Sequence, residues 1–212
     1  WNRKLFKSKS NLKFKMIEEK KKRKKWFSIP ASKEFREIEI GEVPANSVED
    51  LLNKHLSVPL SMITNDFKKQ GILITFRVTE IKDNKPVTEI KKIEMQPTAV
   101  KKAARRDKNK IDDSFTSKTK DNISVKVKPL LLTRNKTKSS ILSVVRKEAR
   151  KFLIERINSL TYSDLVQQIL NARIQKELRD KLNKIYPLSF CQIRSFIKME
   201  DKKQYASPNN QQ

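Results

Sequence analysis

The chain has 212 residues, with 49 lysine and arginine residues against 24 aspartate and glutamate residues, and a formal net charge of +25. A compact domain with so much like charge repels itself unless a polyanion neutralises it, so nucleic acid, an anionic membrane surface or an acidic protein is the expected partner. Because Gly41 and Gly71 are the only glycines, glycine-rich phosphate loops and dinucleotide fingerprints are close to excluded.

The first half of the chain predicts β-strands. Strands are expected at residues 34–43, 58–63, 72–81 and 86–95, with a short helical turn or a loop at 48–56. The segment 72–81 has the clearest period of two, with large apolar side chains alternating on one face. Turn residues between 81 and 86 make the last two strands a hairpin, and Gly41 and Pro44 indicate a turn after the first strand.

The second half changes to a helical period. A short helix and a charged loop are expected after Pro97, then two strands within 111–132. A long helix follows, capped by Thr137 or Ser139. Its predicted apolar stripe is Ile141, Leu142, Val144, Val145, Ala149, Phe152, Leu153 and Ile157. Next come a helix with a capping box at Thr161–Asp164, a helix at about 171–185, and a last strand at 187–199.

This order predicts an α+β fold. We expect an antiparallel, β-rich, barrel-like body, followed by C-terminal helices and a last strand, with basic extensions. Residues 1–25 are expected to form a basic N-terminal arm, of which 1–15 are either disordered or not native sequence. Residues 26–199 form a single domain, and 200–212 a disordered polar tail.

Positive charge gathers in three clusters that are candidates for RNA binding. They are Lys20, Lys21, Lys22, Arg23, Lys24 and Lys25 running into Trp26; Lys101, Lys102, Arg105, Arg106, Lys108 and Lys110; and Arg134, Lys136 and Lys138. A single cluster of this kind is equally often a solvated charged loop, but three in one small domain favour an external polyanion. The third cluster precedes a helix, whose first N–H groups could also bind phosphate.

Trp26 and Phe27 have two interpretations. They could stack on an unpaired base, or they could anchor the root of the arm in the core. We expect anchoring, because Ile29 and Pro30 extend the same apolar segment.

The sequence predicts no catalytic or metal site and no cofactor. His55 is the only histidine and Cys191 the only cysteine, so a zinc site has too few ligands, and Cys191 is expected in the core. Asp66, Glu80 and Lys82 could form a metal-dependent nuclease site, which is one alternative. A general basic DNA- or RNA-binding protein is another. No apolar run approaches the length of a membrane span.

Several strings resemble an archaeal and eukaryotic small-subunit ribosomal protein family, called S-one-e or three-a-e. They are KKWFSIPA (24–31), the segment 40–45, TNDFKKQ (64–70), KIDDSFTSKTKDNISVKVKPL (110–130) and NKIYPLSFCQIRSFIK (183–198). The resemblance covers roughly residues 20–198 in one order, and the string at 184–188 is its most specific part. The family usually has glycines in the turns where this chain has Asn65 and Asn122, which tolerate the left-handed conformation better than most residues.

The resemblance implies a structural, non-catalytic role on the platform of the small subunit. It implies that the chain binds ribosomal RNA near its 3′ end, beside neighbouring small-subunit proteins and close to the exit path of the messenger RNA. It also implies a cytoplasmic location, in ribosomes.

Overall fold

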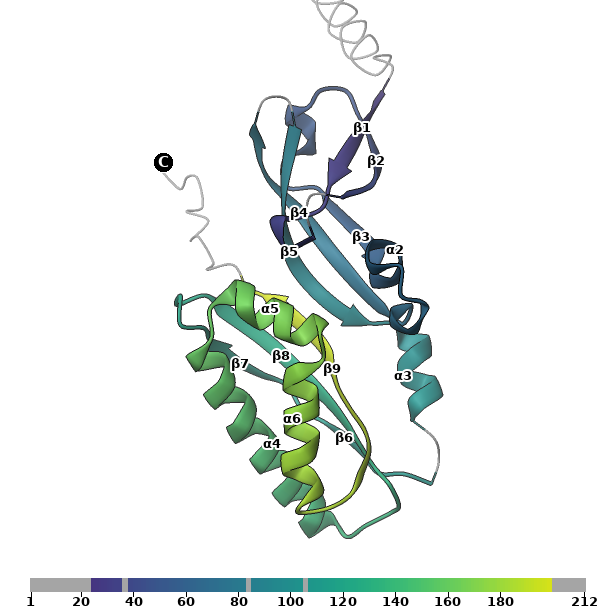
Figure 1. The fold of residues 1–212 in the computed structure, drawn as a ribbon, viewed down its shortest axis with the longest axis vertical. Helices are drawn as coiled ribbons and strands as arrows, with labels where there is room; N and C mark the ends of the chain where they lie inside the picture. The colour runs from purple at the N-terminus through teal and green to yellow at the C-terminus, as the bar shows by residue number, and fades with distance from the viewer. Residues whose placement is uncertain (1–23, 36–37, 83–84, 105–106, 200–212) are drawn as a thin grey trace, which may run out of the picture.

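The computed structural model describes residues 24–35, 38–82, 85–104 and 107–199, which form an α+β body with antiparallel sheets, as predicted (Figure 1). The strands are β1 (Lys25–Pro30), β2 (Glu39–Ala45), β3 (His55–Pro59), β4 (Ile72–Lys82), β5 (Lys85–Met95), β6 (Lys110–Asp112), β7 (Phe115–Lys118), β8 (Ser124–Thr133) and β9 (Leu188–Lys198). The α-helices are α2 (Leu60–Thr64), α3 (Pro97–Ala103), α4 (Ser139–Ser159), α5 (Tyr162–Leu170) and α6 (Arg173–Asn183). Short 3-10 helices are η1 (Lys33–Phe35), η2 (Glu49–Leu51) and η3 (Phe67–Lys69).

The larger sheet is antiparallel, as predicted, but it is open, so the β-rich body is not a closed barrel. Its strand order is β3-β4-β5-β9-β8-β6, with β7 paired to β8, and within the described residues the edge strands β3 and β6 do not pair. Closing a sheet into a barrel needs tilted strands with a continuous stagger. Here the two edge strands are short, with 5 residues in β3 and 3 in β6, and they are not paired with each other in the part of the chain that the structure describes.

A second layer covers the apolar face of this sheet instead. Helices α4, α5 and α6 lie over β8 and β9, and the β1–β2 ribbon lies against β5 (Figure 1). Tyr162, the first residue of α5, stacks on Phe196 of β9 with ring centroids 5.9 Å apart. The Tyr162 hydroxyl also donates a hydrogen bond to the carbonyl of Ile90 in β5. This helix end therefore ties two neighbouring strands together.

The hairpin predicted at 72–95 is confirmed. Strands β4 and β5 pair antiparallel from Ile72 with Met95 to Lys82 with Lys85. Their alternating apolar residues face the core, where Ile74 and Phe76 are fully buried. The register shifts at two irregularities, between Thr75 and Phe76 and between Val78 and Glu80. Between them, the period of two specifies the pairing that buries the apolar face.

Three predictions in the first half are wrong at least in part. The strand predicted at 34–43 begins only at Glu39, after the 3-10 helix η1. Gly41 and Pro44 do not form a turn but lie inside β2, which tolerates proline because it pairs only with β1. The strand predicted at 58–63 ends at Pro59, and the remainder forms α2, which buries Leu60 and Ile63 at helical spacing. A short apolar run fits a strand or a buried helical turn equally well.

Asparagine takes the left-handed conformation at the two turns where the family usually has glycine. Asn65 has φ 53° at the end of α2, and Asn122 has φ 59° between β7 and β8. Asparagine populates this region more readily than most residues with a Cβ. The two departures from the family pattern therefore leave the turns intact.

The C-terminal helices follow the predicted pattern with two corrections. The α4 stripe buries Val145, Ala149, Leu153 and Ile157 as expected, whereas Val144 is 49% exposed. Neither predicted cap is correct, because Lys138 precedes α4 and makes no capping hydrogen bond. The predicted cap of α5 is confirmed, since the Thr161 hydroxyl accepts a hydrogen bond from the Asp164 N–H.

The buried thiol of Cys191 in β9 makes stability depend on alkaline pH. Burial raises its pKa from 9.0 to about 12, although nearby Arg179 opposes the shift. Above pH 9 the unfolded chain releases a proton that the folded chain keeps, so the free energy of unfolding falls as pH rises toward 12, by up to about 1.4 kcal/mol per pH unit.

We expect Cys191→Ala to remove this component of the pH dependence. Urea unfolding of both proteins at a series of pH values measures the difference in unfolding free energy. Burial also raises the pKa of Tyr162, but Tyr162 is present in both proteins and cancels. A difference that stays constant as the solution becomes more alkaline would contradict the prediction.

Candidate nucleic-acid interface

Asn109 joins two of the three predicted basic clusters. Its N–H donates to the Thr133 hydroxyl at 2.9 Å, and its carbonyl accepts from the Thr133 N–H at 3.1 Å. Its side-chain Oδ1 accepts from the Thr137 N–H at 2.8 Å. The cations beside Asn109 therefore lie next to those that flank Thr133 and Thr137. We call this surface the basic junction, and it consists of Lys108, Lys110, Arg134, Lys136 and Lys138.

The loop that carries three of these cations is held from a second side. The Arg134 N–H donates to the carbonyl of Pro187 at 3.0 Å, and the Tyr186 hydroxyl donates to the carbonyl of Asn135 at 3.3 Å. Thr133, at the end of β8, is fully buried. The backbone of the junction is thus fixed by the segments on both sides, while its cationic side chains extend outward.

The charges of the basic junction are largely uncompensated. Lys110, Arg134, Lys136 and Lys138 are exposed, and Lys108 is half-buried. Only Lys110 forms an ion pair among the described residues, at 2.7 Å from Asp112. Such exposed cations repel one another and gain most from an external anion.

The start of α4 adds further donors to the basic junction. The first N–H groups of a helix have no partner within the helix, and no side chain caps them here. The positive end of the helix dipole adds to the charge of the nearby cations. Farther along α4, Arg146, Lys147 and Lys151 are exposed.

Arg150 differs from the other exposed cations of α4, because its guanidinium binds groups within the fold. Its guanidinium donates two hydrogen bonds to the Asp113 carboxylate, at 2.9 and 2.6 Å, and lies 5.9 Å from the ring centroid of buried Phe115. The hydrogen bond from Arg150 is the main cause that lowers the pKa of Asp113. Arg150 therefore joins α4 to the sheet rather than offering charge to a ligand.

The first predicted cluster lies apart from the other two. Lys24 and Lys25 are exposed at the start of β1, near the upper end of the molecule in Figure 1, whereas the loop from β8 to α4 lies at the lower end. Lys101 and Lys102 are exposed on α3, between these ends. The remaining predicted cations, Lys20, Lys21, Lys22, Arg23, Arg105 and Arg106, lie outside the described residues.

The prediction that Trp26 anchors the arm in the core is wrong. Trp26 is 67% exposed, whereas Ile29 is 1% exposed. Successive side chains of a strand point to opposite faces, so Phe27 and Ile29 face the protein and Trp26 faces the solvent. The alternative interpretation, in which the indole is available to an unpaired base, remains a prediction.

The structure does not assemble the alternative nuclease site. Glu80 and Lys82, whose charged groups are 3.4 Å apart, lie near the tip of the β4–β5 hairpin. Asp66 precedes η3 and leads into the opposite end of β4. The described part of the chain has no group of three or more His, Cys, Asp or Glu side chains placed to hold a metal ion. Among the same residues, no helix is both long and apolar enough to span a membrane.

Comparison with known proteins gives consistent matches over most of the chain. Residues 13–201 match the model of the ribosomal S3Ae family. The small ribosomal subunit protein eS1 of Nanoarchaeum equitans is 34% identical over 175 residues, which cover 82% of this chain and 88% of that protein. Proteins of the same name from Saccharolobus islandicus and Desulfurococcus amylolyticus are each 29% identical over 84% of this chain, and 85% and 84% of their own lengths. These matches confirm the resemblance found in the sequence, and the chain belongs to the ribosomal S3Ae family.

Proposed function

We propose that the chain is a structural constituent of the small ribosomal subunit and binds ribosomal RNA through the basic junction. The observation that carries this proposal is the convergence of two basic clusters on Asn109, on a backbone fixed from both sides. The family membership and the names of the relatives, all small ribosomal subunit proteins, support the same assignment.

Binding would follow the phosphate backbone and the shape of folded RNA rather than base sequence. The A-form major groove is too deep and narrow for side chains, so recognition relies on phosphates, 2′-hydroxyls and unpaired loops. Exposed lysine and arginine side chains suit phosphate oxygens. A fixed loop such as 133–138 loses little conformational entropy when its cations meet phosphates.

We extend the proposal to the location and the partners of the chain. We place the chain on the platform of the small subunit, near the 3′ end of the ribosomal RNA and the exit path of the messenger RNA. It lies there beside neighbouring small-subunit proteins, in cytoplasmic ribosomes. The role is non-catalytic and uses no cofactor. The arm at 1–25, with Trp26 at its root, binds the same RNA, as do the cations of α3.

The dependence of RNA affinity on salt tests the proposal. If each of the five cations of the basic junction neutralises one phosphate, the slope of log affinity against log salt is between about −3.5 and −4.5 from this surface alone. We expect the full chain to bind transcribed small-subunit ribosomal RNA with at least this slope, and to sediment with small subunits in a lysate at physiological salt.

Duplex DNA of equal length is the matched competitor in this experiment. A protein that binds by charge alone retains similar affinity for both polymers, whereas a protein shaped for folded ribosomal RNA prefers the RNA. Equal affinity for the two, together with absence from small subunits, would support a general basic nucleic-acid-binding protein and overturn the assignment.

A further inference from the structure

Phe67 in η3 is unusually exposed for a large aromatic residue. It is 88% exposed, and Met62 in the adjacent α2 is 68% exposed. Neither side chain adds much to the core, because the apolar stabilisation of a fold scales with the surface removed from water. The folded chain alone therefore gives no reason for an aromatic ring at this position.

The backbone beneath Phe67 is fixed. Leu60 and Ile63 of α2 are buried in the core, and Asn65 in the left-handed conformation ends the helix. In η3 the Lys69 N–H donates to the carbonyl of Asp66 at 3.0 Å, and the Gln70 N–H donates to the carbonyl of Phe67 at 3.2 Å. The ring is thus presented from an ordered base rather than from a loose loop tip.

Two exposed lysines lie on the helix that contacts the end of the η3 segment. Helix α3 lies directly beside the end of the η3 segment, because the Gln96 N–H donates to the carbonyl of Gly71 at 2.8 Å. A Cβ at Gly71 would lie 3.1 Å from the Ala99 side chain, so the two segments are in close contact. Helix α3 brings exposed Lys101 and Lys102, and neither of them forms an ion pair among the described residues.

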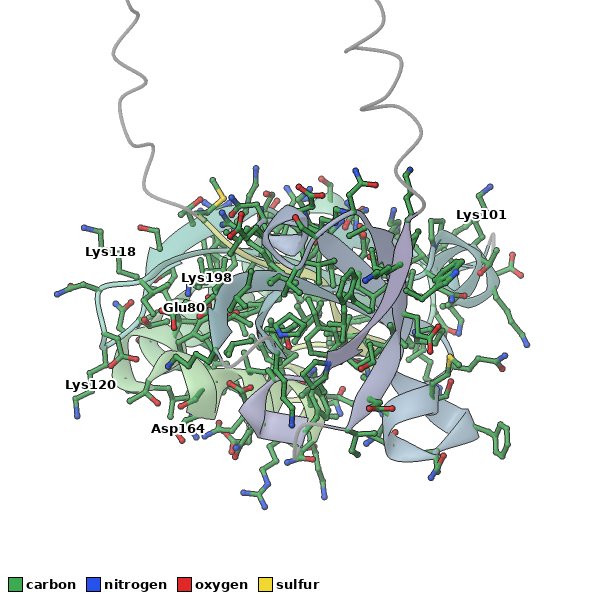
Figure 2. The ribbon with its side chains drawn as sticks, turned by 90° about the horizontal axis from the view of Figure 1, so that it is seen from above. Glu80, Lys101, Lys118, Lys120, Asp164 and Lys198 are labelled. Atoms are coloured by element: carbon green, nitrogen blue, oxygen red, sulfur yellow. The ribbon has the colours of Figure 1, made fainter. Side chains whose placement is uncertain are left out.

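The next described cations along the chain, Lys108 and Lys110, belong to the basic junction. In Figure 1, α2 and α3 lie on the right side of the molecule, and the β8–α4 loop lies at its lower end. Lys101 lies on the right side in Figure 2 as well, opposite Lys118 and Lys120. An exposed aromatic ring near a row of cations is typical of sites that bind unpaired nucleotides, because the bases stack on the ring and the phosphates pair with the cations.

We propose that Phe67 stacks on an unpaired base of the small-subunit ribosomal RNA. This inference rests on the proposed function, because it assumes that the same RNA lies along α3 and the basic junction. It adds a specific residue and a specific kind of contact, a single base drawn out of the helical stack. An apolar pocket of a neighbouring protein is the competing occupant, and Met62 distinguishes the two.

The test compares variants of the full chain binding to transcribed small-subunit ribosomal RNA. Phe67→Leu keeps an apolar side chain but loses the aromatic face, so we expect a loss of affinity of about 5- to 150-fold, with an unchanged salt slope. Phe67→Tyr keeps the face and is expected to bind within about threefold of wild type. Met62→Ala removes a neighbouring apolar side chain that does not stack, and is likewise expected to bind as wild type.

Chemical probing of the RNA identifies the base. We expect one unpaired base that wild type and Phe67→Tyr protect, and that Phe67→Leu leaves reactive. Wild-type affinity and unchanged protection for Phe67→Leu would overturn the inference while leaving the proposed function intact. Loss of a neighbouring protein from subunits assembled with Met62→Ala or Phe67→Ala would also overturn the inference. If the wild-type chain shows no salt-dependent binding to this RNA, the proposed function and the inference both fall.

Discussion

Replacing Arg134, Lys136 and Lys138 by glutamine is expected to lower the affinity for small-subunit ribosomal RNA by about 100-fold at 0.15 M salt. Each cation that neutralises a phosphate contributes about −0.9 to the salt slope, so three contacts have this combined effect. The slope itself becomes less steep by about 2 to 3. Fluorescence anisotropy with labelled RNA over a range of salt concentrations measures both quantities.

A variant with the same change in charge serves as control. Lys118, Lys120 and Arg173 are also two lysines and one arginine, all exposed. They lie around α5, which follows the end of α4, whereas the basic junction lies at the start of α4. The length of α4, about 30 Å, therefore separates the two groups. Replacing them by glutamine should change affinity much less. If the two triple variants lose affinity equally, binding reflects overall charge and the basic junction has no special role.

Phe196→Ala is expected to destabilise the fold by about 3 to 5 kcal/mol. Phe196 is fully buried in β9, beside Ile93 of β5 and Val127 of β8, and stacks on Tyr162. Its removal leaves a cavity between the sheet and the helices. Domains of this size are stable by about 5 to 15 kcal/mol, so a large fraction of the stability is lost. Urea unfolding measures the change.

Phe67→Ala is the matched control for this substitution. It makes the same chemical change in a ring that is 88% exposed rather than 0% exposed. We expect a change in unfolding free energy within about 0.5 kcal/mol. Similar losses in the two variants would mean that the β9 core is not packed as described, or that the surface of η3 contributes to folding.

The sequence predicted elements well where a local pattern admits only one structure. The β4–β5 hairpin combines a long period of two with a turn signal, and the α5 cap is a local motif whose partners are three residues apart. By contrast, the apolar run at 58–63 is too short to separate strand from helix, and its second half became α2. Trp26 is exposed because of the pleat of β1, and the sequence did not predict the limits of that strand.

The candidate site was only partly predictable. The residues of the basic junction were recognised by their charge, but their convergence depends on Asn109, whose partners lie 24 and 28 residues away. No local pattern marks an asparagine for such contacts. In the same way, no local pattern indicates the pairing of Arg150 with Asp113, which joins positions 37 residues apart. Phe67 was missed because exposure is a property of the folded chain.

The position of β9 determines when the larger sheet can form completely during synthesis. This strand, the last one among the described residues, lies in the middle of the sheet, paired with β5 on one side and β8 on the other. During synthesis the inner edge of β5 therefore stays unpaired until β9 has left the ribosome that makes it. Unpaired strand edges readily join those of other molecules. Newly made copies are thus exposed to aggregation until β9 emerges, and without β9 the sheet is interrupted between β5 and β8.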